Sequence, residues 1–340
     1  MVQITFKDVG QGDSILISWS QEGVRKVGII DCHKYGGTNP VLDQIAEFND
    51  EVIVEFIIIS HGHKDHYSGV KELLNYCQKH KIVIQNFVST LHPTQFQFFN
   101  ITLSYNEQLA IANLIKQINE LLEEGITIKN VFPAYNKIIN FQIENLSLTC
   151  LHPKQADYTI LGKKLDQYIK GKTKTKPDLN FISTIFKISG DEFYGLFTSD
   201  CTIESLEHLE RKDQDIKNKE LQLTQVPHHG SINNHYKKFW TDIKRIKNCP
   251  VVISSGESKY GLPNQEVVED FVDLGYKIFS TNYVHGIKSY IEGSESSNDF
   301  SFMLDCFTEL EDEYYIKEKD RFRGDKHFKI DSNGIGVDKH

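Results

Sequence analysis

The chain has 340 residues, of which 39% are hydrophobic and 25% charged, so it can bury the core of one large domain or of two smaller ones. With Asp+Glu 47 against Lys+Arg 38, its formal charge of −9 excludes a global basic field that would attract nucleic acid or anionic lipid. Its six cysteines form no C-x-x-C pair, the start shows no signal-peptide pattern, and no apolar run approaches the roughly 18 residues of a membrane span. These features predict a soluble, cytoplasmic protein with reduced thiols and no membrane contact.

Three strands are predicted at the start of the chain. Residues 2–6 alternate between apolar and polar, Gly10-Gln11-Gly12 provides a turn, and residues 14–17 continue as a second strand. A third strand over residues 27–30 ends at Asp31, where a carboxylate is placed like a site residue, although such a residue alone is more often part of a turn. The apolar spacing after Pro40 then predicts a helix.

The most informative segment is the polar loop that follows the apolar run 52–59. That run is short and rich in β-branched residues, which predicts a buried strand. Directly after it, the H-x-H-x-D-H spacing places four ligand-type side chains at the strand's carboxyl end, where open α/β folds carry their chemistry; they are His61, His63, Asp65 and His66. Neutral imidazole and carboxylate together form the ligand set of zinc, manganese or iron. A metal site is the first hypothesis.

Strands and helices are then expected to alternate, which favours α/β architecture. Helices are predicted over residues 68–80 and 106–124, and strands over residues 82–89, 126–132, 146–151, 181–188 and 193–198. The last strand delivers Ser199 and Asp200, a second carboxylate at a strand terminus, and Thr202 is the expected N-cap of the following helix.

A lysine-rich stretch interrupts this pattern before Asp200. It contains Lys163, Lys164, Lys170, Lys172, Lys174 and Lys176. It can be a solvated loop, or it can be a local landing place for phosphates, which an acidic chain needs if its substrate is nucleic acid.

A histidine pair follows the predicted strand 221–225, in the segment Val226-Pro227-His228-His229-Gly230-Ser231. Beyond it, a strand over residues 251–254, a helix over 265–274, a strand over 277–280 and the apolar stretch 287–291 continue the alternation. From about residue 293 the sequence turns acidic and polar.

The H-x-H-x-D-H loop resembles the signature of the metallo-β-lactamase-fold hydrolases. This resemblance implies that His61 and His63 bind one ion, that Asp65 and His66 bind a second, and that Asp200 bridges the two. It also implies a four-layer αβ/βα sandwich of two mixed sheets with outer helices. We therefore expect a metallo-β-lactamase domain over residues 1–292 and a C-terminal extension of unknown role over residues 293–340.

Two further motifs narrow the resemblance to the soluble metallo-β-lactamase domain of the DNA-uptake competence protein ComEC and its freestanding relatives. They are D-V-G-Q-G-D-S at residues 8–14 and V-P-H-H-G-S at residues 226–231. The resemblance makes His228 a metal ligand, and it places Asp31 and Asn180 at the site. His33, two residues after Asp31, and Asp13, within the first motif, are further candidates for the surroundings of the metals. Asn180 stands where the wider fold family has a histidine, and fewer imidazoles on one ion make Mn²⁺ as well suited as Zn²⁺.

Two positions depart from the pattern of this subgroup. Ser199 replaces a glycine, which leaves the neighbouring ligand Asp200 intact. Leu262 replaces the histidine of a G-H-P motif, and leucine can neither bind metal nor transfer a proton. The second departure leaves open a weakened or inactive site.

The leading hypothesis is a metal-dependent phosphodiesterase, most readily a nuclease acting on DNA or RNA, with one or two Zn²⁺ or Mn²⁺ ions. In it a metal-bound hydroxide is the nucleophile, Asp65 or Asp200 orients it, a protonated His229 assists the leaving oxygen, and Lys172 and Lys174 contact the substrate. Two alternatives remain, because fold does not fix function. One is hydrolysis of a cyclic nucleotide, thioester or lactone; the other is a catalytically weak module that binds nucleic acid, or a protein partner through the C-terminal extension.

Overall fold

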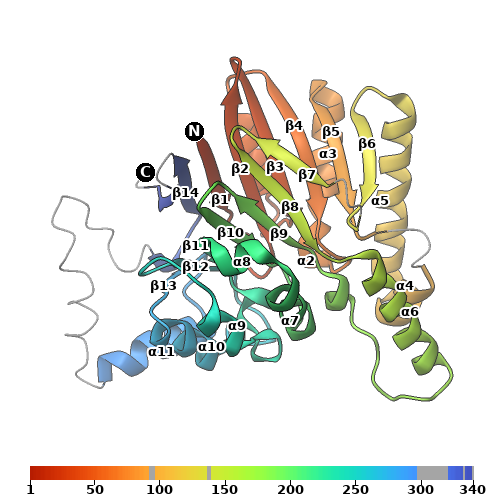
Figure 1. Ribbon diagram of the computed structural model, residues 1–340. Helices are drawn as coiled ribbons and strands as arrows, with labels where there is room; N and C mark the ends of the chain where they lie inside the picture. Colours follow the sequence, from red (N-terminus) through yellow and green to blue (C-terminus); the bar gives the residue numbers. More distant parts are fainter. Residues whose placement is uncertain (92–95, 136–138, 297–320, 332–333, 339–340) are drawn as a thin grey trace.

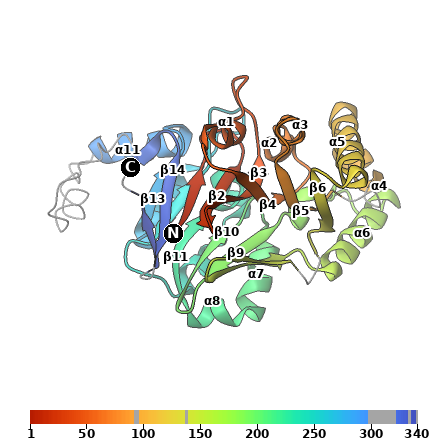
Figure 2. The ribbon, with the colours of Figure 1, turned by 90° about the horizontal axis from the view of Figure 1, so that it is seen from above.

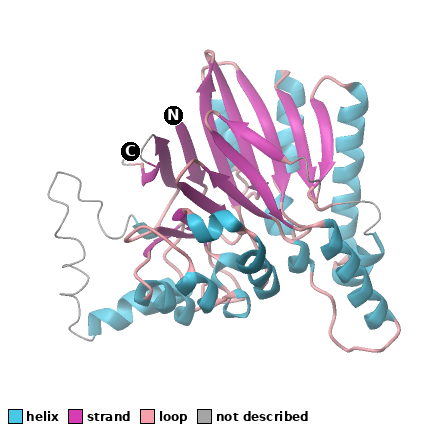
Figure 3. Ribbon diagram, in the orientation of Figure 1, coloured by secondary structure: helices cyan, strands magenta, loops and turns pink. Residues whose placement is uncertain are grey.

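The computed structural model describes residues 1–91, 96–135, 139–296, 321–331 and 334–338. Their strands form two mixed sheets that pack face to face, with helices on both outer surfaces (Figures 1 and 3). The expected αβ/βα sandwich of two mixed sheets with outer helices is confirmed in this arrangement. Among the described helices, none combines the length and apolar character needed to cross a membrane.

The first sheet has the strand order β15-β14-β1-β2-β3-β4-β5-β6. Strands β1 to β3 pair antiparallel, whereas β3 to β6 pair parallel through helical crossovers. The elements of this half are β1 (Val2–Phe6), β2 (Ser14–Gln21), β3 (Val24–Cys32), α1 (Pro40–Glu47), β4 (Val52–Ile59), α2 (Lys64–Tyr67), α3 (Val70–His80), β5 (Val83–Ser89), α4 (Phe96–Thr102), α5 (Tyr105–Glu124) and β6 (Ile128–Pro133).

The second sheet has the order β13-β12-β11-β10-β9-β8-β7 and repeats this division. Strands β7 to β10 pair antiparallel, and β10 to β13 pair parallel. Its elements are β7 (Asn140–Ile143), β8 (Leu146–His152), α6 (Gln155–Ile169), the 3₁₀ helix η2 (Leu179–Ile182), β9 (Ile185–Ser189), β10 (Phe193–Phe197), α7 (Ile203–Lys212), α8 (Gln214–Asn218), β11 (Glu220–Gln225), η3 (Pro227–Gly230), η4 (Ile232–Asn234), α9 (Lys237–Asp242), β12 (Pro250–Ile253), α10 (Gln265–Asp273), β13 (Lys277–Ser280) and α11 (His285–Ser296).

Three buried apolar clusters correspond to the three interfaces of the sandwich. One lies between the first sheet and α1, α3 and α5, one lies between the two sheets, and one lies between the second sheet and α7, α9 and α10. Figure 2 shows α1, α3 and α5 on one outer side of the sandwich and α7 and α8 on the other. The helices follow from amphipathic sequence: α5 begins with a capping box formed by Ser104 and Glu107, buries one face through Ile111 and Ile118, and ends at Gly125. The burial of these faces fixes where the strand ends meet.

The C-terminal residues complete the first sheet. Strands β14 (Lys326–Asp331) and β15 (Gly334–Val337) form a hairpin, and β14 pairs antiparallel with β1, with Val2 opposite Ile330. Phe328 is fully buried between the two sheets. We expected a C-terminal extension over residues 293–340. The part of it that forms β14 and β15 belongs to the first sheet.

Three predicted elements differ in detail. The expected helix 68–80 begins only at Val70, as α3, with Gly69 as its N-cap, and the separate short helix α2 precedes it in the metal loop. The stretch 287–291 was expected to continue the strand alternation, but it lies in α11, because Ile287 and Ile291 are four residues apart and face the same core cluster. The strand expected over 181–188 begins only at Ile185, because η2 precedes it; there the Asp178 carboxylate accepts a hydrogen bond from Asn180 N.

Candidate metal centre

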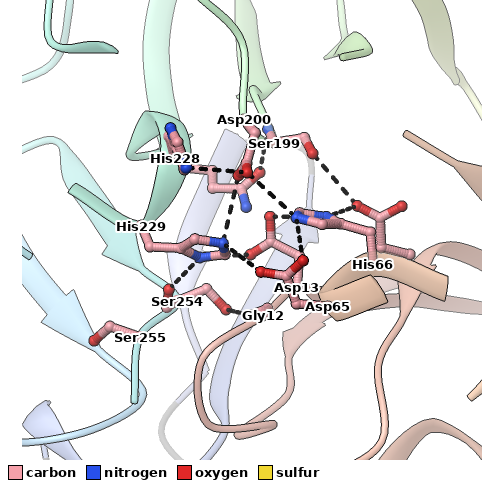
Figure 4. Close-up of polar contacts among 12 residues, drawn as sticks. Gly12, Asp13, Asp65, His66, Ser199, Asp200, His228, His229, Ser254 and Ser255 are labelled. Carbon is pink, nitrogen blue, oxygen red and sulfur yellow. Dashed lines mark hydrogen bonds and ion pairs between the residues drawn. The ribbon is translucent and has the colours of Figure 1, made fainter. Parts of the chain in front are cut away.

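The candidate site lies where the carboxyl ends of central strands from both sheets meet. The first sheet contributes the turn before β2, the end of β3 and the loop after β4; the second sheet contributes the loops after β10 and β11. The first set carries Asp13, Asp31, His61, His63, Asp65 and His66, and the second carries Asp200, His228 and His229. Figure 4 shows Asp13, Asp65 and His66 of the first set facing Asp200, His228 and His229 of the second. In each sheet this is the point where antiparallel pairing gives way to parallel pairing.

Two groups of side chains have the composition and spacing of metal sites. Asp13, His66, Asp200 and His229 form one group, and His61, His63 and Asp200 form the other. Within each group the potential ligand atoms all lie within 4.8 Å of one another. Asp200 belongs to both groups, so the described residues contain two adjacent candidate ion sites with one shared carboxylate.

The Asp200 carboxylate is surrounded by four imidazoles. Its Oδ2 lies 3.6 Å from Nε2 of His61, 3.5 Å from Nε2 of His66 and 3.5 Å from Nε2 of His228. Its Oδ1 lies 3.4 Å from Nε2 of His229. These separations are longer than good hydrogen bonds, and all four imidazoles present the same nitrogen to the carboxylate. The four Nε2 atoms and the Asp200 carboxylate therefore face a common space between these side chains.

Three of these imidazoles are held from behind through Nδ1. The acceptors are the Asp31 carboxylate for His66, the Asn234 side-chain oxygen for His228 and the Ser254 carbonyl for His229, each at 2.8 Å. Because each acceptor fixes a proton on Nδ1, the neutral form of each imidazole has its lone pair on Nε2, facing Asp200. Metal-binding histidines are oriented by hydrogen bonds of this kind.

The remaining pair, His61 and His63, face each other, with Nε2 of His61 2.9 Å from Nδ1 of His63. On its far side, Nδ1 of His61 lies 3.1 Å from the Ser60 hydroxyl and 3.4 Å from the Ser183 hydroxyl. His61 is fully buried, and His63 is half-buried. The two rings thus offer one nitrogen each to the same space beside Asp200.

Buried polar atoms that lack a hydrogen-bond partner indicate whether this arrangement fits a cation. Buried polar atoms in folded proteins are nearly always bonded. Among the described residues, buried atoms without a partner include both carboxylate oxygens of Asp13, Oδ1 of Asp200, and Nε2 of His66 and of His229. These atoms belong to one group of ligand-type residues. The donor set of imidazole nitrogen and carboxylate oxygen fits Zn²⁺, Mn²⁺ or iron.

Charge is concentrated among these buried groups. Burial opposes ionisation of Asp200, but the imidazoles of His228, His229 and His66 outweigh it and hold its pKa well below the usual range. Burial also opposes protonation of His229, yet Asp200 and Asp13 raise its pKa to about 9. Burial raises the pKa of Asp13 to about 6. Protons therefore compete for the atoms that would bind metal, so metal binding would release them.

Other residues expected at the site also lie near it. Oδ2 of Asp65 is 3.6 Å from Nε2 of His229, and Oδ1 is 3.9 Å from Nε2 of His66. The amide nitrogen of Asn180 lies 3.3 Å from Nδ1 of His228. His33 is at the rim, where Nδ1 is 2.7 Å from the Ser68 hydroxyl.

Two expectations change with this geometry. His229 was expected to act as an acid, but its Nε2 lies inside a candidate ligand group. Asp13 was expected near the ligands, and the structure puts it among them. Lys172 and Lys174 are exposed in the loop after α6 and belong to neither ligand group. The individual roles of these residues remain predictions.

Backbone geometry around the loops is tight. A Cβ on Gly12, whose φ is +152°, would lie 2.6 Å from the carbonyl oxygen of Asp65, and Asp13 N donates to that same oxygen at 3.1 Å. His228 and His229 have φ values of 48° and 54°, which side chains rarely adopt. Backbone strain of this kind clusters at functional sites.

Sequence reasoning missed the residues that orient the imidazoles. Asn234, Ser183 and Ser254 lie in three different segments, and each bonds a candidate ligand or its loop. No spacing rule links them to the histidines, because they come from elements that meet only in the folded chain. Ser60 alone had a local signal, since it directly precedes His61.

Comparisons with known proteins give a fold likeness only. No protein-family model matches the chain, and no curated protein matches it. Among solved structures, the metallo-β-lactamase fold protein YhfI from Bacillus subtilis is 10% identical, with a TM-score of 0.42 over 82% of this chain and 96% of that one. Zn²⁺-bound PqqB from Methylobacterium extorquens is 9% identical, with a TM-score of 0.42 over 82% and 98%. A diphosphatase of the PhnP family is 10% identical, with a TM-score of 0.39 over 82% and 94%. Likeness at this level carries no argument about chemistry.

Proposed function

We propose that this chain is a metal-dependent phosphodiesterase, and that its substrate is a nucleic acid. The observation that carries the proposal is the sharing of Asp200 between two candidate ligand groups. A pair of divalent ions supplies Lewis acidity towards phosphoryl oxygens, produces a nucleophile from water at neutral pH, and clamps the attacking and leaving oxygens of an in-line displacement. Phosphodiester hydrolysis makes use of each of these.

The residues divide into two ligand sets. His61, His63 and His228 would hold one ion together with Asp200. The second ion would be held by Asp200 and by Asp13, Asp65, His66 and His229. Zn²⁺ suits the imidazole-rich first set, whereas the carboxylates of the second suit Zn²⁺ and Mn²⁺ alike.

The partly exposed residues mark the side from which substrate would enter. Only part of the ligand set reaches the surface: the side chain of Asp65 is 32% exposed and that of His228 is 28% exposed, whereas that of Asp200 is 2% exposed. Asp65 is therefore placed to contact and orient a bound substrate. Asn180 is buried beside His228, and its side-chain oxygen has no hydrogen-bond partner, so it is available to a group bound there.

Polymer binding would need local positive charge, because the whole chain has a net charge of −9. The loop between α6 and η2 leads directly to Asn180 and carries Lys172 and Lys174, both exposed. Lys170 is paired with Asp166 at 2.8 Å, which reduces its availability. This loop supports the nucleic-acid proposal over the small-substrate one, since phosphate contacts supply most of the affinity for nucleic acid.

The alternative is hydrolysis of a small substrate such as a cyclic nucleotide. It is favoured by the depth of the site, because Asp13, His66, Asp200 and His229 are all nearly inaccessible to solvent. A polymer has to bring a phosphate to that depth through the partly exposed side. The two proposals assign the same metal ligands and differ only in the substrate contacts outside the ligand set.

The test begins with protein stripped by a chelator and reloaded with Zn²⁺ or Mn²⁺. We expect metal-dependent hydrolysis of a chromogenic phosphodiester and of single-stranded DNA, duplex DNA or RNA. Asp200→Asn should abolish both activities. Asp270→Asn is the matched control, because Asp270 also faces a histidine, His235 at 3.0 Å, but lies outside both ligand groups. Hydrolysis that persists in chelator or in Asp200→Asn would refute the proposal, and activity on small phosphodiesters alone would favour the alternative.

A further inference from the structure

The ligand groups draw on both halves of the sandwich, so their geometry depends on how the halves are aligned at the site. His61, His63 and His66 are carried by the first sheet, whereas Asp200, His228 and His229 are carried by the second. Within each half, backbone pairing fixes the loops. Between the halves, the loops are joined by the backbone hydrogen bond from Thr184 N to the Ser60 carbonyl at 3.3 Å and by side-chain hydrogen bonds, such as that from the Ser254 hydroxyl to the Gly12 carbonyl at 3.0 Å.

Ser199 makes such a contact at the centre of the site. Its hydroxyl lies 2.8 Å from the Ser60 hydroxyl and 3.4 Å from Oδ2 of Asp31. Ser199 follows β10 of the second sheet, while Ser60 and Asp31 terminate β4 and β3 of the first. All three side chains are buried. The contact therefore joins the two sheets next to the candidate ligand Asp200.

Hydrogen bonds of Ser60 connect this contact to both ligand groups. Its hydroxyl donates to Oδ2 of Asp31 at 2.6 Å, and its backbone nitrogen donates to Oδ1 at 2.7 Å. The same Asp31 oxygen accepts from Nδ1 of His66 at 2.8 Å. The Ser60 hydroxyl also lies 3.1 Å from Nδ1 of His61. One hydroxyl is thus linked to a histidine of each group.

The backbone of Ser199 is held just as closely in its own half. Its nitrogen donates to the side-chain oxygen of Gln225 at 2.9 Å, and its carbonyl accepts from His228 N at 2.9 Å. Its φ of 44° is in the left-handed region, which glycine adopts freely and serine does not. A serine at such a strained position, with its hydroxyl hydrogen-bonded, indicates that the hydroxyl has a role.

We propose that Ser199 is a positioning residue whose hydroxyl aligns the two halves of the metal centre. By donating to the Ser60 hydroxyl, it holds the Ser60 and Asp31 pair in the orientation that directs Nε2 of His66 and of His61 towards Asp200, the residue next to it in sequence. The inference rests on the proposed metal centre and adds a residue to it that touches neither metal nor substrate.

Two variants separate the hydroxyl from the backbone strain. Ser199→Gly removes the hydroxyl and relieves the left-handed φ, whereas Ser199→Ala removes the hydroxyl and retains the strain. Both should weaken Zn²⁺ or Mn²⁺ binding about 10-fold or more, which is the usual effect of removing a group that orients a ligand. Ser199→Gly should do so without lowering the melting temperature of the chelated protein, an outcome that a merely structural role would not give.

The matched control is Ser189→Ala. Ser189 is also a buried serine of the second sheet whose hydroxyl meets another serine, Ser147 at 3.1 Å, but both partners belong to the β8–β9 pair, away from the ligands. Its metal dissociation constant should match that of the wild type. The proposal is overturned if Ser199→Gly and Ser199→Ala bind metal as tightly as this control.

Failure of the proposed function would be distinguishable. If the wild-type chain binds neither Zn²⁺ nor Mn²⁺, the metal centre itself is refuted. The alignment is then tested in chelator by combining Ser199→Ala with Ser60→Ala, or with Ser60→Cys if the alanine variant does not fold. Melting-temperature shifts that are clearly non-additive support the contact, because the two hydroxyls act on each other; additive shifts overturn it.

Discussion

Replacing Asp200 by Asn is the sharpest perturbation of the proposed centre. The substitution keeps the shape of the side chain and removes its charge. Asp200 is the one residue shared by the two described ligand groups, and its oxygens lie 3.4 to 3.6 Å from four imidazole nitrogens. An amide offers one neutral oxygen in place of two charged ones, so we expect both ions to be lost. A substitution confined to one ligand group, by contrast, should remove only one ion.

The expected magnitude follows from linkage. A ligand present at 100 times its dissociation constant stabilises the folded state by about 2.7 kcal/mol, so two independent ions contribute roughly 5 kcal/mol. For a chain of this size, each kcal/mol raises the melting temperature by roughly 2 °C. The wild type should therefore gain about 10 °C on addition of metal to the stripped protein. His63→Ala, which affects one group, should retain about half of this gain, and Asp200→Asn should retain almost none.

The assay combines thermal unfolding, with and without metal, and elemental analysis of the same samples. The expected stoichiometries are two ions for the wild type and for Asp270→Asn, one for His63→Ala and none for Asp200→Asn. If Asp200→Asn still took up two ions with the full thermal gain, the shared-carboxylate arrangement would be wrong. Equal losses in His63→Ala and Asp200→Asn would mean that the chain holds a single ion.

Three further outcomes are expected. Replacing Lys172 and Lys174 by Gln should weaken polymer cleavage and flatten the dependence of log affinity on log salt by roughly 0.7 to 0.9 per lost phosphate contact, while hydrolysis of a chromogenic phosphodiester stays constant; equal losses on both substrates would contradict this. Phe328→Ala should destabilise the protein by about 3 to 5 kcal/mol in urea unfolding, because the ring is fully buried between the sheets, whereas a cost below about 1 kcal/mol would show that the C-terminal hairpin is dispensable. Burial raises the thiol pKa of Cys77 and of Cys150 to about 12, whereas unfolded thiols ionise near 9. The stability that comes from burying these neutral thiols is therefore complete below pH 9 and is lost as the pH rises towards 12. Alkaline unfolding and thiol labelling should coincide, and labelling of the folded protein at pH 8 would contradict this.

The local parts of the site could be predicted from the sequence. His61, His63, Asp65 and His66 lie within six residues, directly after a run whose β-branched content indicates a buried strand, and that run is β4. Asp200 could be placed by the same reasoning, since it also follows a strand. Strand ends and side-chain spacing are short-range properties, so sequence patterns contain them.

Long-range features could not be found in this way. The hairpin of β14 and β15 completes the first sheet by pairing with β1, which lies more than 300 residues away in sequence, and no local pattern shows which strand it joins. Asn234 fixes the tautomer of His228, yet only the turn after β11 brings the two together. The stretch 287–291 was misassigned because five apolar-rich residues fit a strand as well as a helix, and packing against α10 decides between them.

The pairing of β1 with β14 has a consequence for how the chain is made. During synthesis β1 emerges long before β14, so one of its two edges has no partner until residue 330 has left the ribosome, because Val2 pairs with Ile330. For most of that time the nascent first sheet exposes the edge of β1 that β14 later covers. Exposed edges invite pairing with other chains, and contacts this distant in sequence form slowly. The pairing of β1 is therefore completed long after its translation, and in the interval between the two events its open edge is exposed to aggregation.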